Sequence, residues 1–107
     1  MRRYASVIGL KPEHRDEYER LHTAVWPEVL AQIYASNIRN YSIYRHGELL
    51  FAYFEYVGED FAGDMAKMAA DPSTQKWWDL CKPLQTPVVD RAPGDWWSYI
   101  DEVFHVE

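Results

Sequence analysis

The chain has 107 residues, 48% of them hydrophobic and 16% aromatic, and a formal net charge of −6 at pH 7. This length predicts one domain, residues 1–107, and the acidic balance lacks the basic bias of nucleic-acid-binding proteins. The single cysteine excludes an intrachain disulfide, no apolar run reaches the roughly 20 residues that cross a bilayer, and the N-terminus lacks a signal-peptide pattern, so we expect a cytoplasmic protein with no membrane or nucleic-acid partner.

The first predicted elements are a strand and a long helix. The alternation of residues in Arg2–Leu10 predicts a strand with one buried face. Residues 11–36 predict one long helix, because Pro12 is tolerated in a first turn and acidic residues are enriched early. Pro27 removes the donor for a carbonyl of the preceding turn, so we expect the helix to bend there.

A β-hairpin is predicted next, over residues 38–57. Two runs rich in aromatic and branched residues flank a short turn at His46 and Gly47. The second arm, Leu49–Val57, is apolar at nearly every position, which is typical of a central strand covered on both faces.

The rest of the chain predicts two helical pieces, a loop and a last strand. The helical pieces lie within residues 59–84 and are separated at Asp71–Pro72, and Gln85–Asp95 holds two prolines and a glycine and is expected to form a loop. Residues 96–107 alternate and predict a strand.

This order of elements, β-α-β-β-α-β, matches a ferredoxin-like α+β fold. Such a fold is an antiparallel sheet with helices on one face and with the first and third strands at its centre. The apolar residues on the other face predict that a second copy covers it, giving a homodimer of the dimeric α/β-barrel type.

A titratable aromatic stripe lies within the predicted helix. Tyr18, His22 and Trp26 are spaced by four residues and therefore share one helical face. Imidazole both gives and takes a proton near neutral pH, so His22 is a candidate acid or base. The alternatives are that His22 is a half-buried structural histidine and that Tyr18 only packs its ring.

Further aromatic candidates lie in the hairpin and in "KWWDL". In the hairpin, either Tyr41 or Tyr44 must face the helices. In "KWWDL", Trp77 and Trp78 point about 100° apart on a helix, so only one of them fits the centre of a buried stripe. The other ring would fill an interface or edge a cleft that binds the apolar face of a sugar, although both could simply pack.

The remaining aromatic and histidine residues suggest less. On a strand, Trp96 and Trp97 point to opposite faces, and at least one of them belongs to the core or to a dimer contact. His14, His46 and His105 lie at a helix start, a turn and a chain end, where solvent exposure is favoured. No spacing resembles a metal site, a phosphate-binding loop or a Ser or Cys nucleophile signature, so we expect a reaction without a cofactor.

Taken together, these stretches resemble the L-rhamnose mutarotase family. "DEYERLHTAVWPEV", "NYSIY", "LLFAYFE", "KWWDL" and "EVFH" occur in the order and at nearly the spacing of that family. The combined pattern E-Y-x-x-x-H-x-x-x-W-P with W-W downstream is more specific than any single piece.

The resemblance implies a dimeric ferredoxin-like isomerase that interconverts the α and β anomers of a 6-deoxyhexose, with L-rhamnose first. It implies that His22 is the proton donor, and that Tyr18, Tyr41, Trp77 and Trp78 contact the sugar. Residues 85–97 depart from the family's Asn/Asp/Ser-rich loop, which leaves L-fucose or another sugar as an alternative.

The chemistry of mutarotation fits these residues. Opening a cyclic hemiacetal requires a proton on the ring oxygen and the loss of one from the anomeric hydroxyl, so one near-neutral acid/base and a few hydroxyl groups suffice. Our hypothesis is that His22 protonates the ring oxygen while Tyr18 and Tyr41 orient sugar hydroxyls. A cofactor-independent oxygenase and a non-catalytic small-molecule-binding domain remain alternatives, since a fold alone does not determine function.

Overall fold

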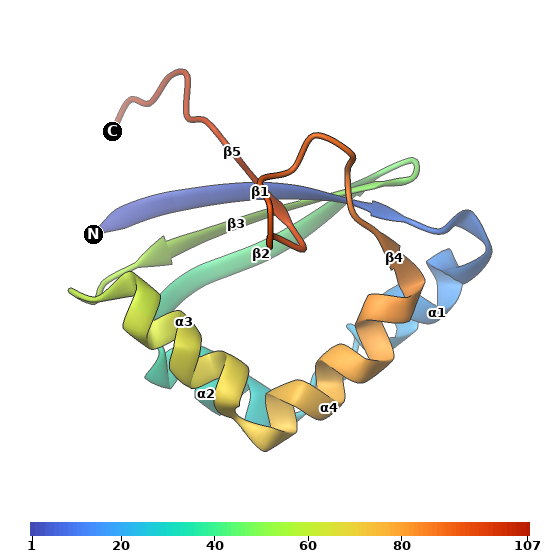
Figure 1. Ribbon diagram of the computed structural model, residues 1–107, viewed down its shortest axis with the longest axis horizontal. Coiled ribbons are helices and arrows are strands. Elements are labelled where there is room, and N and C mark those ends of the chain that lie inside the picture. The colour runs from blue at the N-terminus through green and yellow to red at the C-terminus, as the bar shows by residue number, and fades with distance from the viewer.

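The computed structural model describes all residues, 1–107, and consists of an antiparallel sheet with four α-helices on one face (Figure 1). The strands are β1 (Arg2–Leu10), β2 (Ile38–His46), β3 (Leu49–Tyr56), β4 (Gln85–Thr86) and β5 (Ser98–Ile100). The helices are α1 (Arg15–Leu21), α2 (Pro27–Ala35), α3 (Phe61–Ala70) and α4 (Pro72–Cys81), with short 3₁₀ turns at Pro12–His14 and Lys82–Leu84. None of these helices is both long enough and apolar enough to span a bilayer.

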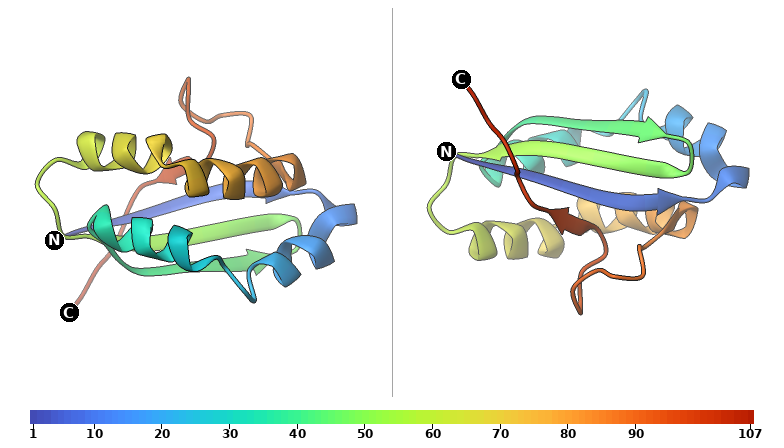
Figure 2. Two further views of the ribbon diagram at one scale, coloured as in Figure 1. Left: turned by 90° about the horizontal axis from the view of Figure 1, so that it is seen from below. Right: turned by 90° about the horizontal axis from the view of Figure 1, so that it is seen from above.

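The strand order β2-β3-β1-β4 confirms the predicted α+β, ferredoxin-like arrangement with the first and third strands inside the sheet. Figure 2 shows that the helices cover one face and leave the other free of helices. Along β1, Ser6, Ile8 and Leu10 are buried and face the helices, while the residues between them face the opposite side. The hairpin is also confirmed, but its two turn residues are Gly47 and Glu48, one position later than predicted, because His46 still belongs to β2.

The fourth strand of this arrangement is divided into two pieces. Both β4 and β5 pair with the same edge of β1: Leu10 lies opposite Gln85, and Ala5 lies opposite Ile100. The prediction that Gln85–Asp95 is entirely loop is therefore wrong at its first two residues, since Gln85 and Thr86 pair with β1.

The predicted helix over residues 11–36 is wrong, because the chain breaks completely where we expected only a bend. Helix α1 ends at Leu21, and α2 begins at Pro27. Trp26 has φ −60° and ψ 138°, the extended conformation that a following proline favours. Tyr18 and Trp26 therefore do not lie on one helix.

The predicted separation between the later helices is confirmed, and side chains cap both of them. The carboxylate of Asp60 accepts a hydrogen bond from the backbone N–H of Gly63 at the start of α3. The carboxylate of Asp71 accepts one from the N–H of Thr74 at the start of α4. An acidic N-cap stabilises a helix by about 1 kcal/mol, so these short helices are well terminated.

The predicted strand over residues 96–107 is wrong except for Ser98–Ile100. Trp96 and Trp97 precede β5, so they do not alternate across a sheet, and both pack against the main core. Residues 101–107 are exposed and have no regular structure. They continue beyond the three β1 residues that pair with β5. There, the side chains of Arg3 and Glu102 form an ion pair at 2.8 Å.

The core lies between the sheet and the helices and has two parts. The smaller part joins Ile38, Phe54 and Met68. The larger part combines residues from β1, β3, three α-helices and the 3₁₀ turn at Lys82–Leu84. Its buried members are Ile8, Leu10, Tyr18, Val29, Leu50, Trp77, Cys81 and Leu84.

Candidate active site

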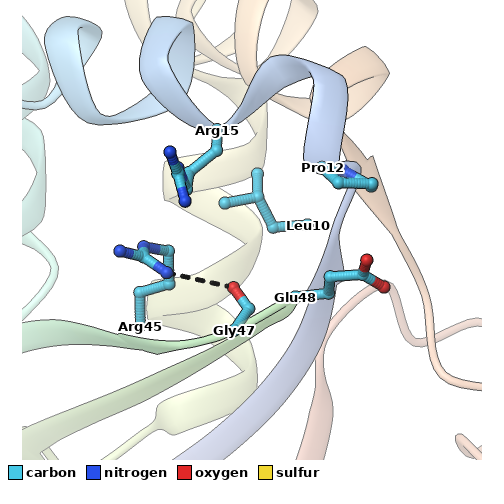
Figure 3. A pocket seen from close by; sticks show the side chains of 6 residues that line it. All are labelled: Leu10, Pro12, Arg15, Arg45, Gly47 and Glu48. Atoms are coloured by element: carbon cyan, nitrogen blue, oxygen red, sulfur yellow. Dashed lines mark hydrogen bonds between the residues drawn. The ribbon is translucent and has the colours of Figure 1, made fainter.

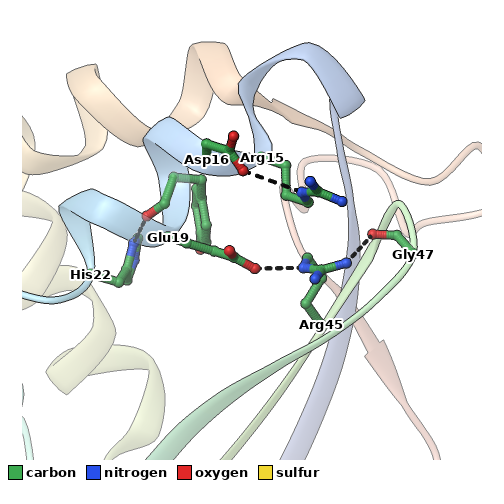
Figure 4. Close-up of polar contacts among 7 residues, drawn as sticks. Arg15, Asp16, Glu19, His22, Arg45 and Gly47 are labelled. Carbon is green, nitrogen blue, oxygen red and sulfur yellow. Dashed lines mark hydrogen bonds and ion pairs between the residues drawn. The ribbon is translucent and has the colours of Figure 1, made fainter.

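His22 lies at the C-terminal end of α1, where the helix break places its ring against two aromatic neighbours. Its Nδ1 is 2.8 Å from the backbone carbonyl oxygen of Tyr18, one turn earlier (Figure 4). The imidazole stacks on the Tyr18 ring with 4.2 Å between centroids. It also meets the Trp77 ring edge-on at 5.3 Å. Residues from α1 and α4 therefore hold the imidazole in one orientation.

This hydrogen bond determines the tautomer of neutral His22. A carbonyl oxygen only accepts hydrogen bonds, so Nδ1 carries the proton and Nε2 presents a lone pair. Burial lowers the pKa of His22 below its ordinary value, and the bond to the Tyr18 carbonyl offsets part of that effect. Neutral imidazole with a free Nε2 is therefore the main form at neutral pH.

The Tyr18 hydroxyl belongs to a buried hydrogen-bond chain. Tyr18 is only 4% exposed, and its hydroxyl oxygen accepts a hydrogen bond from Nε2 of Gln85 at 3.3 Å. Oε1 of Gln85 accepts a bond from the indole Nε1 of Trp96 at 2.8 Å. Burial raises the pKa of Tyr18, so the hydroxyl stays protonated across the physiological range.

Sequence reasoning missed Gln85. A glutamine beside a proline-rich loop carries no pattern that indicates burial, and its partners Tyr18 and Trp96 are distant in the sequence. Only the pairing of β4 with β1 brings Gln85 to 5% exposure beside Tyr18.

Tyr41 is the hairpin tyrosine that faces the helices, whereas Tyr44 is 66% exposed. Tyr41 and Tyr44 are three residues apart and therefore point to opposite faces of the strand. An irregularity in β2 between Arg39 and Ser42, where Asn40 has φ +50°, lets Tyr41 share the helix-side face with Ile38. On that face, the Tyr41 ring lies 5.8 Å from the buried Phe54 ring, between centroids.

Tyr41 as a whole residue is 41% exposed, yet its pKa is raised in the manner of a desolvated phenol. Desolvation raises the pKa of Tyr41 to about 12, with smaller effects from Tyr99 and Cys81. Tyr41 in turn contributes to the raised pKa of Tyr18, which indicates that the two hydroxyl groups lie near one another. The raised pKa values of Tyr18 and Tyr41 keep both hydroxyls protonated across the physiological range.

The two adjacent tryptophans of α4 have different surroundings. Trp77 is 6% exposed and meets both His22 and Trp26 at 5.3 Å between ring centroids. Trp78 is half-buried, and the Lys82 ammonium lies 4.9 Å from its ring centroid. Trp77 is therefore the ring at the centre of the buried stripe. It contacts both His22 and Trp26, which lie on either side of the helix break.

A separate hollow lies where the hairpin turn meets the chain after β1, and none of the aromatic candidates lines it (Figure 3). Its lining residues are Leu10, Pro12, Arg15, Arg45, Gly47 and Glu48. Arg45 is occupied there by an ion pair with Glu19 at 2.6 Å and by the Gly47 carbonyl at 3.2 Å (Figure 4). No imidazole or aromatic ring lines this hollow, so it lacks the acid/base and stacking groups that the proposed chemistry on a sugar requires.

The other histidines are not part of the candidate site. His14 lies 3.5 Å from Glu17, and His46 and His105 are exposed. No three His, Cys, Asp or Glu side chains are grouped so as to hold a metal ion. The candidate active site therefore consists of His22, Tyr18, Tyr41 and the α4 tryptophans, with Gln85 and Trp96 behind Tyr18.

Comparisons with known proteins place the chain in a family. The family model for L-rhamnose mutarotase matches residues 3–106. An L-rhamnose mutarotase from Oceanobacillus iheyensis is 33% identical over 100% of both chains. One from Phocaeicola vulgatus is 35% identical, again over 100% of both chains.

Solved structures agree on the fold. An L-rhamnose mutarotase from Formosa agariphila superposes with a TM-score of 0.77 at 23% identity, covering 100% of both chains. The tetracenomycin F2 cyclase of Streptomyces glaucescens, a type-II polyketide cyclase, superposes with a TM-score of 0.71 at 12% identity over the same coverage. At these identities the solved structures support only the fold, whereas the family model and the relatives show family membership. The chain belongs to the L-rhamnose mutarotase family.

Proposed function

We propose that this protein is an isomerase that interconverts the α and β anomers of L-rhamnose by opening and closing the sugar ring. The observation that carries the proposal is the state of His22, a neutral imidazole whose Nδ1 is bonded to the Tyr18 carbonyl and whose Nε2 is left to exchange protons. The relatives named L-rhamnose mutarotase, at 33% and 35% identity over the whole chain, support the choice of substrate.

In this mechanism His22 moves one proton between two oxygens of the same carbon. Nε2 takes the proton of the anomeric hydroxyl and delivers it to the ring oxygen, as the bond from the anomeric carbon to the ring oxygen breaks and a carbonyl forms. The open aldehyde rotates about its first carbon–carbon bond, and the same steps run in reverse to close the other face. His22 begins and ends neutral, which suits its lowered pKa.

We propose that the surrounding aromatic residues bind the sugar. Tyr18 and Tyr41 offer protonated hydroxyls that orient sugar oxygens, since burial keeps the pKa of both phenols high. Trp77 forms a buried wall beside His22, and Trp78 offers a more accessible ring for the apolar face of the sugar.

Saturation-transfer NMR on equilibrated L-rhamnose tests this function. Irradiating one anomeric proton should attenuate the signal of the other anomer only when the protein is present. L-Fucose and D-glucose in parallel samples rank the sugars, and transfer with L-fucose alone would reassign the substrate.

No transfer with any sugar would contradict the mutarotase assignment. Oxygen uptake with a phenolic substrate would then favour the oxygenase, while sugar-dependent chemical-shift changes without exchange would favour a binding domain.

We also propose that the whole chain, residues 1–107, acts as one unit and forms a homodimer through the helix-free face of the sheet. Val7, Tyr44 and Phe51 lie on that face and are exposed or half-buried in the single chain. Ile100 extends the same apolar surface from β5. Covering it with a second copy removes apolar area from water, at about 25 cal/mol per Å².

We place the protein in the cytoplasm, where a reducing environment suits a protein whose one cysteine, Cys81, is free and buried. Fractionation of cells from the source organism, followed by immunoblotting, would test this location, and recovery from outside the cytoplasm would contradict it.

A further inference from the structure

Gln85 sits between the proposed sugar-binding Tyr18 and a tryptophan of the loop that departs from the family pattern. It is 5% exposed, and both ends of its amide are hydrogen-bonded. Trp96 donates to the amide oxygen at 2.8 Å. The amide nitrogen donates to the Tyr18 hydroxyl at 3.3 Å.

The direction of this chain follows from the chemistry of its members. An indole N–H only donates, so the oxygen of the Gln85 amide must face Trp96. The amide NH₂ group must then face Tyr18, and an NH₂ group of this kind cannot accept a hydrogen bond. The Tyr18 oxygen is therefore the acceptor, and its own proton has to point elsewhere.

Trp96 is itself held in place by a cation. The Lys82 ammonium lies 5.6 Å from the Trp96 ring centroid and 4.9 Å from that of Trp78. Lys82 thus links the loop after β4 to the end of α4 through two aromatic rings. The position of the indole N–H depends on this contact and on the packing of Trp96 against the main core.

We propose that Gln85 and Trp96 are a positioning pair that makes Tyr18 a fixed hydrogen-bond donor toward a sugar oxygen. The proposal rests on the proposed function, because it concerns the same site. Neither residue touches the reacting carbon; both act through the Tyr18 hydroxyl. Because the Tyr18 oxygen already accepts from Gln85, its proton is directed toward the sugar, and the sugar oxygen that meets this proton must accept. The pair therefore restricts how the sugar is oriented.

Gln85→Glu is the sharpest variant, because it keeps the shape of the side chain and reverses one hydrogen bond. The carboxylate still accepts from Trp96, but it also accepts from Tyr18 and turns the tyrosine proton away from the sugar. We expect kcat/KM for L-rhamnose to fall roughly tenfold, the usual effect of one misdirected hydrogen bond. Trp96→Phe keeps an aromatic ring but removes the indole N–H, so the Gln85 amide is free to flip and a smaller loss is expected.

Two controls separate positioning from a structural effect. Gln75→Glu adds the same charge on the exposed surface of α4 and should leave kcat/KM unchanged. In a Tyr18→Phe background, Gln85→Glu should change kcat/KM less than about twofold, since the hydroxyl through which it acts is absent. A full tenfold loss in that background would overturn the proposal.

The same variants are also titrated with L-rhamnose and followed by protein chemical shifts, so that binding is measured apart from turnover. If the unaltered protein exchanges anomers and the Gln85→Glu variant has the same kcat/KM, the positioning role is refuted and the mutarotase function is supported. If the protein binds the sugar without exchange and Gln85→Glu weakens binding only when Tyr18 is present, the positioning role stands and the mutarotase falls. If no sugar binds, both are overturned.

Discussion

Tyr18 contacts His22 twice, once through its backbone and once through its ring. Its carbonyl oxygen lies 2.8 Å from Nδ1 of His22, and the two rings stack at 4.2 Å between centroids. The first contact selects the tautomer, and the second contributes to the burial that lowers the pKa of His22. One residue therefore determines which nitrogen exchanges protons and how readily.

The pH dependence of catalysis follows from this arrangement. If neutral His22 is the active form, kcat/KM is level at neutral pH and falls as His22 becomes protonated. Because burial lowers its pKa from the ordinary 6.5, the fall should be centred below pH 6.5. Mutarotation rates measured from pH 4.5 to 8, with the uncatalysed rate subtracted, check this. A catalysed rate that instead rises on acidification would mean that the imidazolium is the active form.

Trp77 and Trp78 should differ in what their loss does. Truncating a buried tryptophan costs about 3–5 kcal/mol, so Trp77→Ala should lower the free energy of unfolding by that order. Trp78 is half-buried, and Trp78→Ala should cost less stability while raising KM for L-rhamnose several-fold. Urea denaturation and steady-state kinetics on the two variants separate these effects. Equal loss of stability in both would refute the distinction.

A polar network around Asp64 should make the free energy of unfolding depend on pH in the acidic range. The Tyr56 hydroxyl and, at 2.9 Å, the Asn37 amide donate to one carboxylate oxygen of Asp64. These bonds hold the pKa of Asp64 below its ordinary value of 3.8. The ionised form is therefore favoured by folding, and its contribution is present above that pH and is lost as the pH falls through the folded-state pKa.

Tyr56→Phe removes the hydrogen bond that lowers the pKa of Asp64 the most. It should lower the urea midpoint at pH 7 and reduce the difference between the midpoints at pH 7 and pH 3. Tyr34→Phe, which removes the hydroxyl of an exposed tyrosine of α2, serves as a comparison that leaves the Asp64 network intact. A Tyr56→Phe protein that loses stability toward pH 3 as steeply as the unaltered one would rule out this role for the network.

The proposed dimer can be disrupted at the helix-free face of the sheet. Phe51 lies between Val7 and Tyr44 there, so Phe51→Glu would place an unpaired charge in the interface and should yield a monomer in sedimentation velocity. Tyr34→Glu, which alters an exposed residue of α2, should leave the mass unchanged. If the unaltered protein sediments as a monomer, the dimer proposal is wrong.

The parts of this fold that could be predicted are those with local causes. The break between α3 and α4 follows from Asp71 and Pro72, an N-cap followed by a residue that starts helices. The central position of β3 follows from its nearly continuous apolar residues. Tyr18 and His22 were predicted to be neighbours because four residues separate them on α1.

The remaining features depend on contacts between distant segments. Nothing local distinguishes a proline that bends a helix from one that ends it, and at Pro27 the packing of Trp26 on Trp77 accompanies a complete break. The burial of Gln85 requires β4 to pair with β1, and its bond to Trp96 requires the intervening loop to fold back. Periodicity in one sequence does not contain that information.

The most direct test of the central claim is the saturation-transfer rate between L-rhamnose anomers with His22→Gln in place of the unaltered protein. Glutamine keeps an amide that can donate to the Tyr18 carbonyl, but it cannot exchange a proton with the sugar. The account predicts that catalysed exchange falls by about 10²–10⁴-fold, while the variant keeps its fold and still binds L-rhamnose. Exchange at the unaltered rate would show that His22 does not move the proton.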